Sequence, residues 1–127
     1  MVKVPDVAIT RERFEELVAE ALDEIPERFL AMMENVEVMV EDEPTASLLR
    51  SLGLHPRRDT VFGLYDGVPL DEREANYAMN LPDRITLFYR PLVEACRGER
   101  TLRREIRKTV VHEIAHFFGL DEEDVWE

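Results

Sequence analysis

Two histidines and a glutamate near the end of the chain have the types and the spacing of a metal site. His112 and His116 are four residues apart, so on a helix both project from one face and can bind a single Zn²⁺ through their imidazole nitrogens. Glu113 lies between them and can take a proton from a metal-activated water. The string therefore predicts a hydrolytic site, with one Zn²⁺ ion as cofactor and Glu113 as the general base.

The segment that carries these residues has the pattern of a long helix. Residues 101–118 contain no Gly or Pro, and apolar residues recur on one flank at helical spacing. On the stripe that holds the histidines, Glu105 and Thr109 precede His112 by about two turns and one turn. We expect both to lie beside the metal face. The alternative is that His112 and His116 are partly buried histidines, each with its own backbone or carboxylate partner. Their neighbours are apolar, and an unpaired ring in such surroundings would cost about 1–3 kcal/mol, which favours a shared ion.

The third metal ligand is expected close to the two histidines. A catalytic zinc usually has three protein ligands and leaves a fourth position to water. The sequence continues for only eleven residues past His116, which is too short for a glutamate on a separate downstream helix. Gly119 can take the left-handed conformation that ends a helix and turns the chain back. In the longer pattern HExxHxxGxxH the third ligand falls at Glu122. The alternatives are Asp121, Asp124 and His55.

The rest of the chain predicts short helices and strands. Thr10 is a candidate N-cap for a helix that stops near Pro26, and a second short helix is expected at 27–33. Apolar and polar residues alternate at 36–40 and 84–89, which predicts strands, and a further short strand is expected at 60–65. Short helices are expected before Gly53 and from Pro91. This order of elements predicts an α+β fold.

Four stretches of the chain resemble the small bacterial zincin-like metallopeptidases, sometimes called minimal metalloproteases. They are residues 36–44, 62–70, 81–92 and 109–121. The resemblance implies a compact zincin-like α+β fold, with a small mixed sheet packed against the active-site helix and N-terminal helices. It also implies zinc-dependent peptidase activity. Members of the family often carry aspartate at the position of Glu122, whose side chain is longer by one methylene.

Zincins bind an extended peptide against an exposed sheet edge above the active-site helix, through backbone hydrogen bonds. Either predicted strand, 60–65 or 84–89, is a candidate for that edge. The loop between them is long enough to shape a cleft, and Tyr77 and Asn80 are candidate polar contacts within it.

Composition predicts one soluble cytoplasmic domain over residues 1–127. The formal charge of −12 argues against nucleic acid, because phosphates would be repelled. No apolar run has the length of a signal peptide or a membrane span, so no membrane partner is expected. The single Cys96 excludes an intrachain disulfide and suits a reducing compartment. We expect this cysteine to act as a small buried hydrophobic residue rather than as a ligand or nucleophile.

A basic cluster begins the predicted motif helix. We expect it to pair with acidic residues of the first helix, such as Glu12, Glu15, Glu16 and Glu20. The alternative is that it steers an acidic segment of a protein substrate. The cluster consists of Arg97, Arg100, Arg103, Arg104, Arg107 and Lys108.

Two classes of function fit the sequence. The first is a zinc-dependent peptidase that acts on a peptide or protein substrate, and hydrolysis of another amide would use the same chemistry. The second is a zinc-stabilised binding or regulatory domain with little or no proteolytic activity. A purely structural zinc would have four protein ligands, whereas a catalytic zinc keeps one coordination position for water. The two classes therefore differ in the number of protein ligands.

Overall fold

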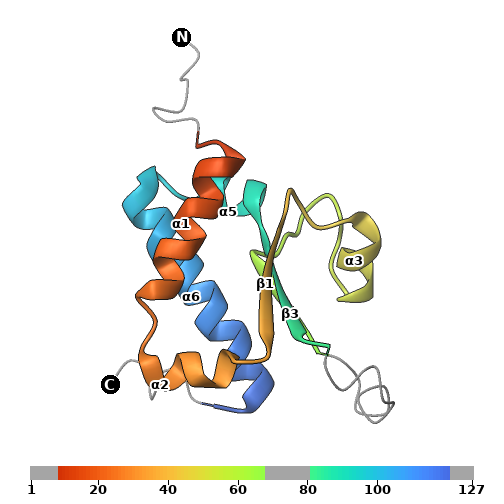
Figure 1. The fold of residues 1–127 in the computed structure, drawn as a ribbon. Coiled ribbons are helices and arrows are strands. Elements are labelled where there is room, and N and C mark those ends of the chain that lie inside the picture. The colour runs from red at the N-terminus through yellow and green to blue at the C-terminus, as the bar shows by residue number, and fades with distance from the viewer. Residues whose placement is uncertain (1–8, 68–80, 121–127) are drawn as a thin grey trace.

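The computed structural model describes residues 9–67 and 81–120. Helices α1 and α6 lie side by side and cover one side of a small sheet, while α3 lies on the other side of the strands (Figure 1). This arrangement confirms the predicted α+β fold. The helices are α1 (Arg11–Asp23), α2 (Glu27–Leu30), the 3₁₀ helix η1 (Ala31–Met33), α3 (Ala46–Ser51), α5 (Tyr89–Ala95) and α6 (Gly98–Phe118).

The described sheet has three strands in the order β1-β3-β2. Its members are β1 (Val36–Glu41), β2 (Gly63–Asp66) and β3 (Asp83–Phe88). β1 is parallel to β3 and β2 is antiparallel to it, so the sheet is mixed as predicted. Because β3 is central among the described strands, segment 84–89 is excluded as the exposed edge, and of the two candidates only the segment that contains β2 lies at an edge. β2 is the edge strand that packs against α6.

Most predicted elements form, with shifts at their ends. The Thr10 hydroxyl accepts a hydrogen bond from the Arg13 N–H at 3.1 Å, which confirms it as the N-cap of α1. β2 begins three residues later than predicted, at Gly63, and α6 begins earlier, at Gly98. Tyr89 starts α5 instead of ending β3, and its ring packs edge-to-face on Phe14 with 5.3 Å between centroids.

The hydrophobic core lies between α1, α6 and the central strand. β3 contributes Ile85 and Leu87, which are fully buried. The predicted apolar flank of α6 is buried at Leu102, Ile106 and Val110, whereas Phe117 at its far end is 51% exposed. Among the described residues, no helix combines the length and the apolar character that crossing a bilayer would require. The buried side chains of the two long helices include Phe14, Leu17, Ala21, Leu102, Ile106, Val110 and Ile114.

Ion pairs join α1 to α6 along their exposed flanks. Arg13 binds both carboxylate oxygens of Glu99, at 2.8 and 2.7 Å. Arg103 and Arg107 of the basic cluster pair with Glu24, and Arg103 also reaches Glu20 at 3.4 Å. The predicted pairing between this cluster and the first helix is therefore confirmed for these two arginines.

The Arg13–Glu99 pair makes part of the stability depend on pH. The hydrogen bonds from Arg13 lower the pKa of Glu99 below its ordinary value. The pair therefore stabilises the fold above the ordinary glutamate pKa, and this contribution is lost as pH falls through the lowered pKa. We expect Glu99→Gln to lower the melting temperature near neutral pH and to have no effect well below pH about 4. Glu94→Gln, at an exposed site on α5, is the matched control and should leave the melting temperature unchanged at both neutral and acid pH. A Glu99→Gln difference that grows towards acid pH would contradict this.

Candidate metal centre

His112 and His116 lie side by side on consecutive turns of α6. Their ring centroids are 6.4 Å apart and the ring planes differ by 13°. Both side chains are exposed, because Val111, Ile114 and Ala115 turn into the core and leave the histidine face outside. The alternative of two partly buried histidines is therefore not what the structure shows. Two exposed nitrogen donors on one helix face, with a carboxylate between them, fit a divalent ion such as zinc.

Glu113 is held by the edge strand. Its side chain is half-buried, and its Oε1 accepts the backbone N–H of Tyr65 at 3.0 Å. The Tyr65 ring stacks on Phe117 with 4.0 Å between centroids, and its hydroxyl donates to the Asp83 carboxylate at 2.5 Å. Sequence analysis placed Tyr65 in a strand but did not identify this contact, because no local pattern connects residues 48 positions apart.

A glycine lets β2 approach α6 closely. A Cβ atom on Gly63 would lie 2.8 Å from the Thr109 Cγ2 and 3.1 Å from the Thr86 carbonyl oxygen. Thr109 is buried, and its hydroxyl donates to the Glu105 carbonyl oxygen at 2.8 Å. The strand therefore rests directly on the helix one turn before Glu113.

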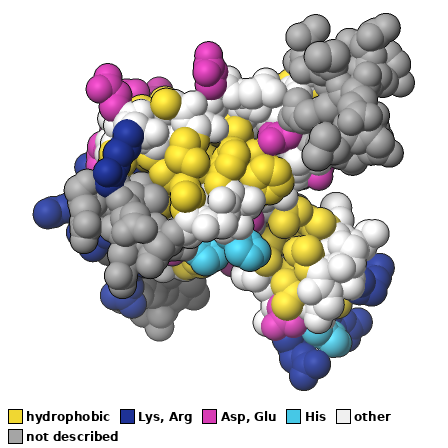
Figure 2. All heavy atoms as spheres, turned by 90° about the horizontal axis from the view of Figure 1, so that it is seen from below, with side chains coloured by type: hydrophobic (Ala, Val, Ile, Leu, Met, Phe, Trp, Pro, Cys, Tyr) yellow, Lys and Arg dark blue, Asp and Glu magenta, His cyan; other side chains and the backbone are white. Residues whose placement is uncertain are grey.

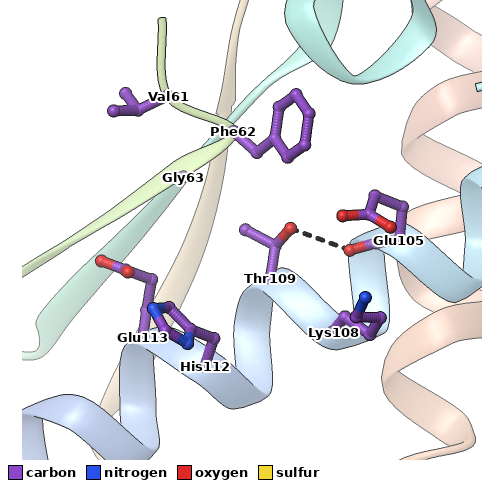
Figure 3. Close-up of a pocket in the computed structure, with 8 residues that line it drawn as sticks. All are labelled: Val61, Phe62, Gly63, Glu105, Lys108, Thr109, His112 and Glu113. Atoms are coloured by element: carbon purple, nitrogen blue, oxygen red, sulfur yellow. Dashed lines mark hydrogen bonds between the residues drawn. The ribbon is translucent and has the colours of Figure 1, made fainter. Parts of the chain in front are cut away.

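A pocket of about 350 Å³ opens beside His112 and Glu113. Figure 3 shows it between the start of β2 and the side chains of α6. Glu105 and Thr109, which were predicted beside the metal face, both line it, but His116 does not. Its lining residues are Val61, Phe62, Gly63, Glu105, Lys108, Thr109, His112 and Glu113.

The end of α6 has the predicted turn. Gly119 has φ +69° and caps the helix in the left-handed conformation, and the Leu120 N–H donates to the Ala115 carbonyl oxygen at 2.7 Å. No third His, Cys, Asp or Glu joins the histidine pair within residues 9–67 and 81–120, so the structure does not bring His55 to the pair. The other candidate ligands and the two candidate loop contacts lie outside the described residues; they are Glu122, Asp121, Asp124, Tyr77 and Asn80.

Cys96 is half-buried and packs against the core, less enclosed than predicted. Burial raises the pKa of its thiol, and the nearby Glu105 raises it further. The thiol therefore stays protonated at neutral pH, which disfavours a role as a thiolate ligand or nucleophile.

The close contact of Gly63 with Thr109 gives a stability prediction. Gly63→Ala should destabilise the fold by about 1–3 kcal/mol, because the added methyl group overlaps the Thr109 Cγ2. Thr109→Ser removes that carbon and keeps the hydroxyl, so the double variant should recover part of the loss. Urea denaturation of both single variants and the double variant measures this coupling. Strictly additive effects would show that the two residues do not meet as described.

Comparison with known proteins finds a sequence family and a similar solved structure. A sequence-family model described as zincin-like metallopeptidase matches residues 33–127. A solved structure of a conserved hypothetical protein from Thermo thermophilus is similar to this chain, with 26% identity and a TM-score of 0.57. That similarity covers 87% of this chain and 94% of the other. No curated protein matches.

Proposed function

This chain belongs to the zincin-like metallopeptidase family, and we propose that it is a zinc-dependent peptidase with Glu113 as its general base. One observation carries the proposal. Glu113 lies between two histidines at ligand spacing, and the same carboxylate accepts a hydrogen bond from the edge strand. This position between the histidine pair and the edge strand supports the assignment of Glu113 as the base.

His112 and His116 would hold the ion, with Glu122 as the proposed third ligand. When bound, zinc activates water for attack and polarises the peptide carbonyl. Glu113 takes the proton from the water and passes it to the leaving amine. Its hydrogen bond to the Tyr65 N–H keeps the carboxylate turned towards the peptide instead of into solvent.

The outer side of β2 is the proposed peptide site. The Tyr65 N–H donates to Glu113, so it points out of the ladder with β3. Backbone groups of alternate strand residues point to the same side, so Gly63 shares that outer side with Tyr65. Because the Tyr65 N–H is already donated to Glu113, a peptide added along this edge would bind the Gly63 backbone groups and the Tyr65 carbonyl oxygen, which would bring its scissile bond beside Glu113. A side chain next to that bond could enter the 350 Å³ pocket.

Replacement of the proposed base separates chemistry from folding. Glu113→Gln should lower kcat for peptide cleavage by about 10²-fold or more, because the amide cannot take a proton. Its melting temperature should stay close to that of the unmodified protein, because the amide oxygen still accepts the Tyr65 N–H. The measurement is turnover of a diverse peptide library by zinc-loaded protein, with Glu94→Gln as control. Undiminished cleavage by Glu113→Gln would overturn the assignment. Bound zinc without cleavage by any variant would instead support the zinc-stabilised binding domain.

The third ligand can be tested by metal affinity alone. Glu122→Ala should weaken zinc binding by more than the ~10–100-fold that follows loss of an outer-shell partner. Asp121→Ala and Asp124→Ala are matched controls, each removing one nearby carboxylate. Competition with a chromophoric chelator gives the three affinities. A loss confined to one of the aspartate variants would move the ligand to that residue.

A further inference from the structure

Between β1 and β2 the chain forms a projection that we name the α3 lobe, residues 46–60. Leu49 anchors it, being only 4% exposed, and the Thr45 hydroxyl caps α3 by accepting the Leu48 N–H at 3.0 Å. Figure 2 shows a lobe that projects from the body, with basic, histidine and acidic side chains at its tip. A hollow separates it from the face of the body that also carries histidine.

The α3 lobe carries exposed positive charge. Arg50, Arg57 and Arg58 are exposed, and among residues 9–67 and 81–120 none of them makes an ion pair. In contrast, Arg13 and Arg103 are each paired with glutamates between α1 and α6. The whole chain has a formal charge of −12, so this cluster of guanidinium groups is a local reversal of sign.

The turn after α3 is tightly hydrogen-bonded. The His55 N–H donates to the Asp59 carboxylate at 2.6 Å, and the Asp59 N–H donates to the His55 carbonyl oxygen at 2.9 Å. The Arg57 N–H donates to the His55 Nδ1 at 3.1 Å, so the neutral ring carries its proton on Nε2. The turn therefore fixes the backbone beneath Arg57 and Arg58 and leaves the His55 Nε2–H available as a donor.

A cavity of about 590 Å³ lies on this lobe. Basic side chains surround it, and Leu54 and Pro56 add apolar surface. No carboxylate is among the described residues that line it. Planar guanidinium groups bind carboxylates through paired hydrogen bonds, so the cavity suits acidic side chains interspersed with apolar ones. Its lining residues are Arg50, Gly53, Leu54, His55, Pro56, Arg57 and Arg58.

We propose that the α3 lobe binds an acidic segment of the polypeptide substrate, at a distance from the bond that is cut. The identity of that segment as substrate rests on the proposed peptidase function, whereas the binding itself does not. Arg58 is three residues from Val61, which lines the pocket beside Glu113, so the chain between them spans at most about 11 Å. A segment held by the lobe is thereby kept near the cleft. A nucleic acid, with continuous negative charge, would be repelled by the rest of the molecule.

Binding is measured first, with Glu113→Gln as the background so that no peptide is cut. The probe is a fluorescein-labelled twelve-residue peptide of alternating Glu and Leu. Its binding is measured by fluorescence anisotropy. Adding Arg57→Glu and Arg58→Glu should raise the Kd for the peptide by about tenfold or more, because the substituted carboxylates repel it. The matched control is Arg97→Glu with Arg100→Glu, the same charge change at exposed sites at the start of α6. This control should raise the Kd by less than about threefold.

Several results would overturn the proposal. They are no binding of the acidic peptide, equal losses in both double variants, or complete displacement by inorganic phosphate at a few millimolar, which would indicate a simple anion site.

Cleavage is measured second, with Glu113 intact. A cleavable peptide extended by the acidic segment should have a kcat/KM about tenfold above that of its Gln-substituted counterpart, through KM. Arg57→Glu with Arg58→Glu should remove this advantage and leave kcat unchanged. An advantage that persists in this variant would exclude the lobe as its source. If no peptide is cut by any variant, the peptidase function fails while the anisotropy result still decides whether the lobe binds acidic peptides.

Discussion

The packing of the edge strand on the long helix is the constraint on which the site depends. Gly63 meets Thr109, and two residues later Tyr65 meets Glu113 one helical turn further on. Two strand residues advance about 6.7 Å and four helix residues about 6 Å, so strand and helix stay in step. The stack of Tyr65 on Phe117 continues the same register by another turn. A side chain at Gly63 would separate the two elements at the point where they first touch.

The two halves of α6 have different roles because they have different surroundings. Its first half is fixed by buried Leu102 and Ile106 and by ion pairs to α1, which include Arg103 to Glu24. Its last turns keep an apolar side towards the core and expose the two histidines on the other. A helix held firmly at one end can present donors in a fixed orientation at the other, which metal binding requires.

The arginines of two regions differ in whether they are paired, and we assign them different roles. Arginines that join α1 to α6 are neutralised by glutamates, whereas those of the α3 lobe have no such partners among the described residues. Ion pairs between partly exposed side chains contribute modest stability, so the paired arginines also matter for how the two helices are oriented. The guanidinium groups of the lobe lie on the segment that leads into β2, so the chain joins them directly to the edge strand.

Sequence alone determined the features that follow from geometry within one helix or turn. The four-residue spacing of His112 and His116, the Thr10 cap and the left-handed Gly119 were all predictable, because each depends on residues within about one turn. Only the tertiary structure decided that segment 84–89 is central and that Glu113 meets Tyr65, 48 residues away. Those outcomes depend on which strands pair and how closely backbones approach. No periodic pattern in the sequence encodes that choice, because alternation marks a segment as a strand without specifying its neighbours in the sheet.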